Sequence, residues 1–228
     1  MQAFNSKSQT DMKFKAVIFD MDGLLIDSEM HWAKHGPEIW TKLGVIYNED
    51  FRKDIVARRL RDVFQIAKTK YNPKLTWRRT KSVYKNYTQI VYGNDARLLK
   101  GARHLLTALG KKGFLVALGT SSSPMSIRLV MKKYNLKKHF HLTVSAFRMK
   151  KGKPHPAIYH KTMKLLKVKP EETVIFEDSN VGVKAGKASG AKVIAIPDKR
   201  WSHGDFSIAD LVAKSLADEK IYKYLGIK

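Results

Sequence analysis

The chain has 228 residues and is 43% hydrophobic, which is enough for one substantial core with a smaller appended unit and excludes a disordered chain. It contains no cysteine, so disulfides, thiolate metal sites and a cysteine nucleophile are excluded. No apolar run approaches the roughly 20 residues that span a bilayer, and the first residues, MQAFNSKSQTDMK, lack the apolar stretch of a secretory signal. We therefore predict a cytoplasmic protein without a membrane segment.

The chain is strongly basic, with 44 lysines and arginines against 20 acidic residues and a formal net charge of +24. Such a surface attracts phosphates, nucleic acids and anionic membranes through its long-range field. The excess is mainly lysine, is spread along the chain, and is accompanied by no RNP-type, zinc-finger or basic-zipper pattern. We therefore favour lysines on solvated helix faces as the explanation, and nucleic acid is the less favoured partner.

Residues 1–12 form the first predicted segment, a short flexible leader. A buried strand follows at residues 14–19, where the β-branched and aromatic run FKAVIF breaks at DMDG. Residues 31–97 then show only helical or loop signals and are rich in Trp, Tyr and Arg. We predict that they form an inserted, mainly helical cap, in which Trp32, Trp40 and Trp77 build a small core of their own. The catalytic core is expected to comprise residues 13–30 and 98–228.

Beyond the cap, helical and strand patterns alternate. Helices are predicted at residues 101–112, 124–134, 156–166 and 181–189, the last with Gly190 just beyond its end. Short apolar runs predict buried strands at residues 114–118, 173–176 and 192–196, with a weaker candidate at 142–145. Strand alternating with helix predicts an α/β fold, a doubly wound, Rossmann-like parallel sheet.

The carboxyl ends of the predicted strands carry most of the candidate functional residues. In open parallel sheets, ligands bind beyond these ends. The residues found there are Asp20, Asp22, Thr120, Ser121, Glu177 and Asp178, and Lys153 lies in a Gly-Lys-Pro turn before another helix. Carboxylates, hydroxyls and one ammonium at one edge fit phosphoryl transfer, which needs charge compensation, a metal and an in-line nucleophile.

Side-chain chemistry suggests a role for each group. Asp20, directly after a buried strand, can attack phosphorus, and Asp22 can protonate the leaving group and later deprotonate a water molecule. Mg²⁺ prefers oxygen ligands, so Asp178 is expected to complete the coordination shell of the ion with Asp20. Glu177 is expected either to bind the ion directly or to orient the residues that bind it. The hydroxyl of Thr120, the backbone N–H groups of Ser121 and Ser122, and the Lys153 ammonium are expected to hold phosphate oxygens.

Three arginines in the predicted cap, Arg58, Arg59 and Arg61, are candidates for reading the substrate. A guanidinium can hold a second anionic group with two hydrogen bonds. At this spacing the three side chains cannot all face one pocket. We therefore expect Arg58 or Arg59 to contact substrate and at least one of the three to be solvated.

Four segments, FDMDGLLIDSE, LGTSSS, KGKPHP and IFEDSNVGVKAGKASG, resemble, in this order, the four signature motifs of the haloacid dehalogenase-like superfamily. The resemblance covers residues 13–228, although residues 31–97 match only in position and helical character. Because a dehalogenase lacks the second Asp of the first motif, the resemblance implies the phosphatase and phosphomutase branch. It implies that Asp20 is the nucleophile, Asp22 the acid/base, Thr120 and Lys153 phosphate ligands, and Asp20, Asp178 and the Asp22 carbonyl metal ligands supported by Glu177.

Within the superfamily, the chain resembles the subgroup of β-phosphoglucomutase, 2-deoxyglucose-6-phosphatase, glycerol-phosphate phosphatase and pseudouridine-5′-phosphatase. The segment GLLIDSE favours the phosphatases. The mutase carries Thr-Asp-Thr-Ala-Glu-Tyr-His after its DxDG, and the corresponding run here is one residue shorter. His31 therefore does not match the histidine with which a mutase protects its phospho-enzyme.

We predict a Mg²⁺-dependent phosphatase that hydrolyses a small sugar, polyol or nucleoside phosphate through an aspartyl-phosphate. A mutase that returns the phosphate to a sugar is the alternative, and a nucleic-acid-binding protein is a third reading based on the charge alone. The expected partner is the small metabolite, and the expected state is a monomer.

Overall fold

The computed structural model describes residues 13–55, 58–200, 202 and 204–227. The expected leader, residues 1–12, lies outside the described residues. Within them, six parallel strands form one sheet in the order β3-β2-β1-β4-β5-β6. The strands are β1 (Ala16–Phe19), β2 (Leu115–Thr120), β3 (Leu142–Ser145), β4 (Thr173–Glu177), β5 (Lys192–Ala195) and β6 (Leu211–Val212). The predicted doubly wound parallel sheet is confirmed, and β6 is an addition to it.

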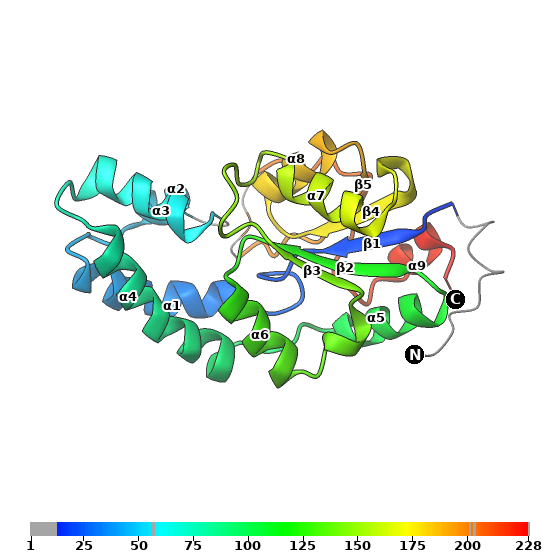
Figure 1. The fold of residues 1–228 in the computed structure, drawn as a ribbon, viewed down its shortest axis with the longest axis horizontal. Coiled ribbons are helices and arrows are strands. Elements are labelled where there is room, and N and C mark those ends of the chain that lie inside the picture. Colours follow the sequence, from blue (N-terminus) through cyan, green and yellow to red (C-terminus); the bar gives the residue numbers. More distant parts are fainter. Residues whose placement is uncertain (1–12, 56–57, 201, 203, 228) are drawn as a thin grey trace.

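Helices cover both faces of the sheet (Figure 1). On one face lie α5 (Ala102–Lys111), α6 (Pro124–Lys133) and α9 (Glu219–Leu225), and on the other lie α7 (Ala157–Leu166) and α8 (Asn180–Ala188). Alternate residues of β1 point to opposite faces of the sheet. Val17 and Phe19 pack in the core with α5, α6 and α9, and Ile18 packs in the core with α7 and α8. Short 3₁₀ turns at Lys137–His139 and Pro170–Glu172 precede β3 and β4.

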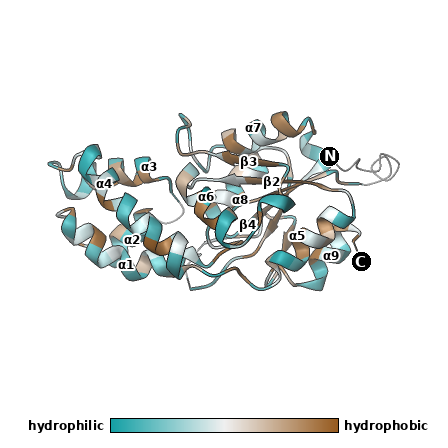
Figure 2. Cartoon of the chain, turned by 60° about the horizontal axis from the view of Figure 1, so that its bottom comes forward, coloured by the Kyte–Doolittle hydropathy of each residue, from teal (hydrophilic) through white to brown (hydrophobic). Residues whose placement is uncertain are grey.

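The four predicted helices of the core are present, and side chains at their ends explain where two of them begin. Ser123 accepts the backbone N–H of Ser126 at the start of α6, and Ser179 accepts that of Gly182 at the start of α8. Helix α8 ends two residues before Gly190, whose φ of +84° suits a glycine. Figure 2 shows hydrophobic residues along the strands and hydrophilic residues on the outer sides of the helices.

Residues 28–55 and 58–95 form a separate group of helices beside the sheet (Figure 1). This cap contains α1 (Ser28–Lys42), α2 (Glu49–Ile55), α3 (Leu60–Ile66) and α4 (Trp77–Thr88), with π-helical turns at η1 (Ala67–Tyr71) and η2 (Gln89–Asp95). Its hydrophobic core is built around Trp40 and Phe51, whose rings pack edge to face with their centroids 4.6 Å apart. Trp32 and Trp77 pack at the margin of this core.

The cap joins the core through two connections that are hydrogen-bonded to each other. The backbone N–H of Asp27 donates to the carbonyl of Arg97 at 3.0 Å, and the backbone N–H of Arg97 donates to Asp27 Oδ1 at 2.5 Å. The Asp27 side chain therefore ties the two connections together and makes no capping bond to α1. In the described part of the chain, no helix has the length and apolarity needed to cross a membrane.

Candidate active site

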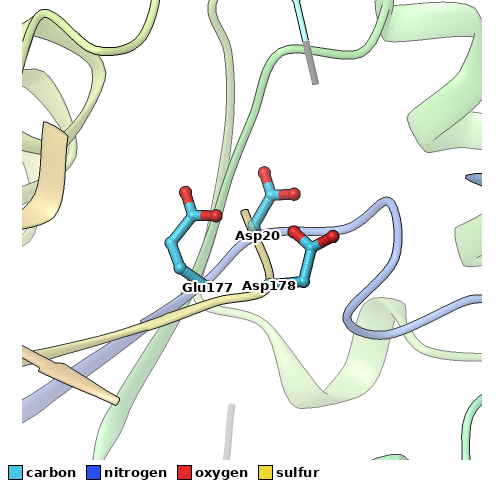
Figure 3. Close-up of side chains that lie close together, drawn as sticks. All are labelled: Asp20, Glu177 and Asp178. Carbon is cyan, nitrogen blue, oxygen red and sulfur yellow. The ribbon is translucent and has the colours of Figure 1, made fainter. Parts of the chain in front are cut away.

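The carboxyl ends of β1 and β4 bring three acidic side chains together. Asp20 follows β1, Glu177 ends β4 and Asp178 follows it, and all three are buried. Figure 3 shows their carboxylates on the same side of the strand ends. One oxygen of each lies within 4.8 Å of the others. Gly23 makes this approach possible, because a Cβ at this position would lie 2.2 Å from Asp178 Oδ2 and its φ is +73°.

Lys153 supplies a positive charge within this cluster. Its Nζ lies 2.8 Å from Asp20 Oδ1 and 2.5 Å from Glu177 Oε1. The Tyr159 hydroxyl donates to the same Glu177 oxygen. Burial alone would lower the pKa of Lys153, but the charges of Asp20 and Glu177 outweigh burial and raise it well above its usual value. The lysine is therefore a fixed cation beside the expected nucleophile.

The acidic cluster fits a divalent cation. Burial raises the pKa of Asp20 to about 7, although Lys153 opposes this shift. Burial, followed by the charges of Glu177 and Asp20, raises the pKa of Asp178 well above its usual value. A bound cation would relieve this repulsion, and an all-oxygen donor set is the kind that Mg²⁺ prefers. Because Glu177 Oε1 already accepts bonds from Lys153 and Tyr159, Asp20 and Asp178 are better placed as direct ligands.

Asp22 is held in a cradle of hydroxyl groups. Its Oδ1 accepts hydrogen bonds from Ser28 and Tyr92, each at 2.7 Å, and its Oδ2 accepts one from Ser122 at 2.7 Å. Tyr92 comes from η2 of the cap and also receives a bond from Trp32 Nε1 at 3.2 Å. The position of the expected acid/base is therefore linked directly to the cap. Tyr92 could not be identified from the sequence, because no local pattern distinguishes it from the other tyrosines of the cap.

Of the two hydroxyl residues expected to bind phosphate, Ser121 lines the cavity and Thr120 does not. Thr120 is fully buried, accepts the backbone N–H of Ser122 at 3.0 Å, and lies 3.5 Å from Asp22 Oδ2. Ser121 lines the cavity beside Asp20, and its buried Oγ has no hydrogen-bond partner among the described residues. An unsatisfied buried hydroxyl is costly unless a ligand pairs with it. Of the two hydroxyls, that of Ser121 is therefore the one available to a phosphate oxygen.

A cavity of about 170 Å³ extends from the acidic cluster into the cap. Aromatic side chains, including Trp32 and Tyr84, line it together with the polar groups of Glu29 and Arg52. Neither Glu29 nor Arg52 is among the site residues predicted from the sequence. Burial, together with the nearby charges of Asp22 and Asp20, raises the pKa of Glu29 to about 8.

The cap arginines divide as their spacing predicts. Arg58 lines the cavity, and Arg61 is exposed and lies over the ring of Trp77. Arg59 is buried, but it bonds to Asp62 and to backbone carbonyls of the core and is not among the residues that line the cavity. This placement differs from the expected substrate contact.

Replacing Tyr92 with Phe should lower kcat for an aryl phosphate by roughly tenfold to a hundredfold, because a hydrogen bond to a charged group contributes roughly 1.5–3 kcal/mol. Ser28 and Ser122 still bond to Asp22 in this variant. Tyr222→Phe is the matched control, since the buried hydroxyl of Tyr222 has no partner in the described part of the chain. Equal kcat values for Tyr92→Phe and the wild type would show that this bond has no part in turnover.

A family model described as haloacid dehalogenase-like hydrolase matches residues 17–196. The chain is 31% identical over 180 residues to a phosphorylated carbohydrates phosphatase of Thermotoga maritima, covering 79% of this chain and 83% of that protein. It is 30% identical over 222 residues to hexitol phosphatase B of Escherichia coli K12, covering 95% and 99%. The crystal structure of β-phosphoglucomutase from Clostridium difficile superposes with a TM-score of 0.76 at 20% identity, covering 93% and 97% of the two chains, and shows a shared fold.

Proposed function

This chain belongs to the haloacid dehalogenase-like hydrolase family, and we propose that it is a Mg²⁺-dependent phosphatase of small phosphorylated metabolites. The observation that supports this most is the buried contact between Lys153 and Asp20, beside Asp178 and at the floor of a cavity. It combines an anionic nucleophile, a cation for the phosphate and a place for a metal.

In the proposed reaction, an oxygen of Asp20 attacks phosphorus and the ester bond to the leaving oxygen breaks. Asp22 gives that oxygen a proton, so the alcohol departs and a phosphoaspartate remains. Asp22 then takes a proton from water as its oxygen attacks phosphorus, which releases inorganic phosphate and restores Asp20. Lys153 and the Ser121 hydroxyl hold the phosphate oxygens. Mg²⁺, held by Asp20, Asp178 and the Asp22 carbonyl, would neutralise phosphate charge.

The lining of the cavity supports a polyol or sugar phosphate as the substrate class. Trp32 and Tyr84 offer ring surfaces to a carbon chain or sugar ring. Glu29 can accept hydrogen bonds from substrate hydroxyl groups, and Arg52 can donate hydrogen bonds to them. The Thermotoga maritima and Escherichia coli relatives are named for phosphorylated carbohydrates and hexitol phosphate, which supports the same class.

A phosphosugar mutase is the less supported alternative. The Thermotoga maritima and Escherichia coli relatives, at 31% and 30% identity, are named as phosphatases, whereas the mutase from Clostridium difficile shares the fold at 20% identity. The run after Gly23 also departs from the mutase pattern in length.

Phosphate release from p-nitrophenyl phosphate, a hexitol phosphate and β-glucose-1-phosphate tests the proposal. We expect inorganic phosphate from the first two in Mg²⁺, loss of activity with EDTA, and recovery when Mg²⁺ is restored. Glucose-6-phosphate forming from β-glucose-1-phosphate faster than inorganic phosphate would favour the mutase. Full activity in EDTA would contradict the metal-dependent mechanism.

A further inference from the structure

A buried guanidinium that does not line the cavity connects the cap to the core. Arg59 immediately precedes α3, and only 5% of its side chain is exposed. Its Nε and Nη2 donate to the two oxygens of Asp62, each at 2.7 Å. Its Nη1 donates to the carbonyl of Met149 at 2.5 Å and, more weakly, to that of Ala146 at 3.4 Å. The fork thus joins a cap residue to a core loop.

This core loop, residues 146–152, leads directly into Lys153. It is fixed at one end by a hydrogen bond from the Ala146 backbone N–H to the Thr120 carbonyl at 2.8 Å. At its other end, Gly152 packs so closely against Arg59 that a Cβ there would lie 2.4 Å from Arg59 Nε. The next residue, Lys153, holds Asp20 and Glu177. Arg59 therefore packs against the residue that precedes the active-site ammonium.

The bonding of Arg59 suits a structural tie better than a substrate contact. Four of its five N–H donors face Asp62 and the two carbonyls. Asp62 balances its charge in place, which a buried guanidinium requires. Arg58, one residue earlier, lines the cavity, so the two neighbouring side chains are directed to different places.

We propose that Arg59 is a positioning residue that fastens the cap to the loop of residues 146–152 and so holds Lys153 against Asp20. The inference rests on the role given to Lys153 in the proposed function. It makes the placement of the active-site ammonium depend on the cap, through a residue that touches neither substrate nor metal. Any substrate should be affected equally when Arg59 is lost, because the phosphate-binding ammonium itself is displaced.

The activity test compares Arg59→Ala with Arg61→Ala, an exposed arginine two residues away. A misplaced catalytic group typically lowers the rate by roughly tenfold to a hundredfold, and we expect a loss of kcat/KM in this range for Arg59→Ala. The fractional loss should be the same for p-nitrophenyl phosphate and for a sugar bisphosphate. Arg61→Ala should match the wild type. Arg59→Lys keeps the charge but lacks the fork that reaches both Asp62 and Met149, so it should restore little of the activity.

Hydrogen exchange provides a readout that does not require turnover. Backbone amides of residues 146–152 should exchange at least about tenfold faster in Arg59→Ala than in the wild type, since the carbonyls of Ala146 and Met149 lose their donor. Arg61→Ala should leave this exchange unchanged. If Arg59→Ala does not fold, Asp62→Asn tests the same tie by weakening the anchor of the guanidinium, with the same direction expected for exchange and rate.

Three outcomes would overturn the inference. The first is unchanged exchange in the loop when Arg59 is replaced. The second is unchanged kcat/KM for p-nitrophenyl phosphate. The third is a loss restricted to the bisphosphate, which would make Arg59 a substrate contact. If the wild type hydrolyses no phosphate ester, the proposed function fails, whereas the exchange measurement still decides whether Arg59 fastens the loop.

Discussion

Replacing Asp20 with Asn should lower kcat for p-nitrophenyl phosphate in Mg²⁺ by at least about 10⁴-fold, as expected when an enzyme loses its nucleophile. An amide of the same shape fills the space beside Lys153 and β4 but does not attack phosphorus. The measurement is the release of p-nitrophenol at saturating substrate, together with acid-quenched labelling from a ³²P-labelled substrate. We expect the wild type to carry label during turnover and Asp20→Asn to carry none.

The matched control is Asp54→Asn. Asp54 lies in the cap and pairs with Lys70 at 2.9 Å on the surface, so the same chemical change there should leave kcat unaffected. Residual activity of Asp20→Asn above about 1% of the wild-type value, after removal of contaminating phosphatase, would rule out covalent catalysis by Asp20.

Strands that are buried on both faces could be predicted from the sequence, whereas peripheral elements could not. Strands β1 and β4 are buried on both faces, so each appears as an uninterrupted apolar run. Strand β6 has only two residues, and Val212 is 46% exposed, so it has neither a run nor an alternation to reveal it. Helix α9 has only seven residues, and it depends on Ile221 and Leu225 packing against the core.

The same distinction holds within the site. Asp20 and Asp178 could be placed because each directly follows a strand, and the edge of a parallel sheet brings such residues together. Tyr92 and Glu29 could not be placed, because their proximity to Asp22 depends on how the cap packs against the core. Thr120 ends β2 and Ser121 follows it. Because successive side chains at a strand end point in opposite directions, the sequence does not show which of the two hydroxyls lines the cavity.

Arg59 also illustrates why residue type alone was insufficient. A guanidinium can donate hydrogen bonds to a substrate phosphate, to a carboxylate and to backbone carbonyls. Only the position of the loop at residues 146–152, more than eighty residues away in sequence, shows which of these Arg59 meets.

The electrostatics of Asp20 and Asp178 predict how stability depends on pH and Mg²⁺. Burial raises the pKa of both groups, to about 7 for Asp20, so the metal-free folded protein retains protons that the unfolded chain has lost. This stabilisation is complete below the unfolded pKa values, near 4, and is lost as the pH rises through the folded values. The metal-free protein should therefore lose thermal stability between pH 5 and pH 8. Mg²⁺ should restore thermal stability most at pH 8, because the ion need not displace protons from Asp20 and Asp178 at that pH.

Asp178→Asn should remove most of this response. With Mg²⁺ at about 100 times its Kd, we expect the wild-type Tm at pH 8 to rise by about 5–10 °C, and by less at pH 5. The variant lacks one of the like charges and a metal ligand, so its metal-free Tm should fall less between pH 5 and pH 8 and should not respond to Mg²⁺. Its kcat should fall by at least about 10³-fold. Thermal unfolding with and without EDTA at both pH values measures these shifts, with Asp54→Asn as the control. A wild-type Mg²⁺ shift that is larger at pH 5, or one that persists in Asp178→Asn, would contradict Asp178 as a ligand within a repulsive cluster.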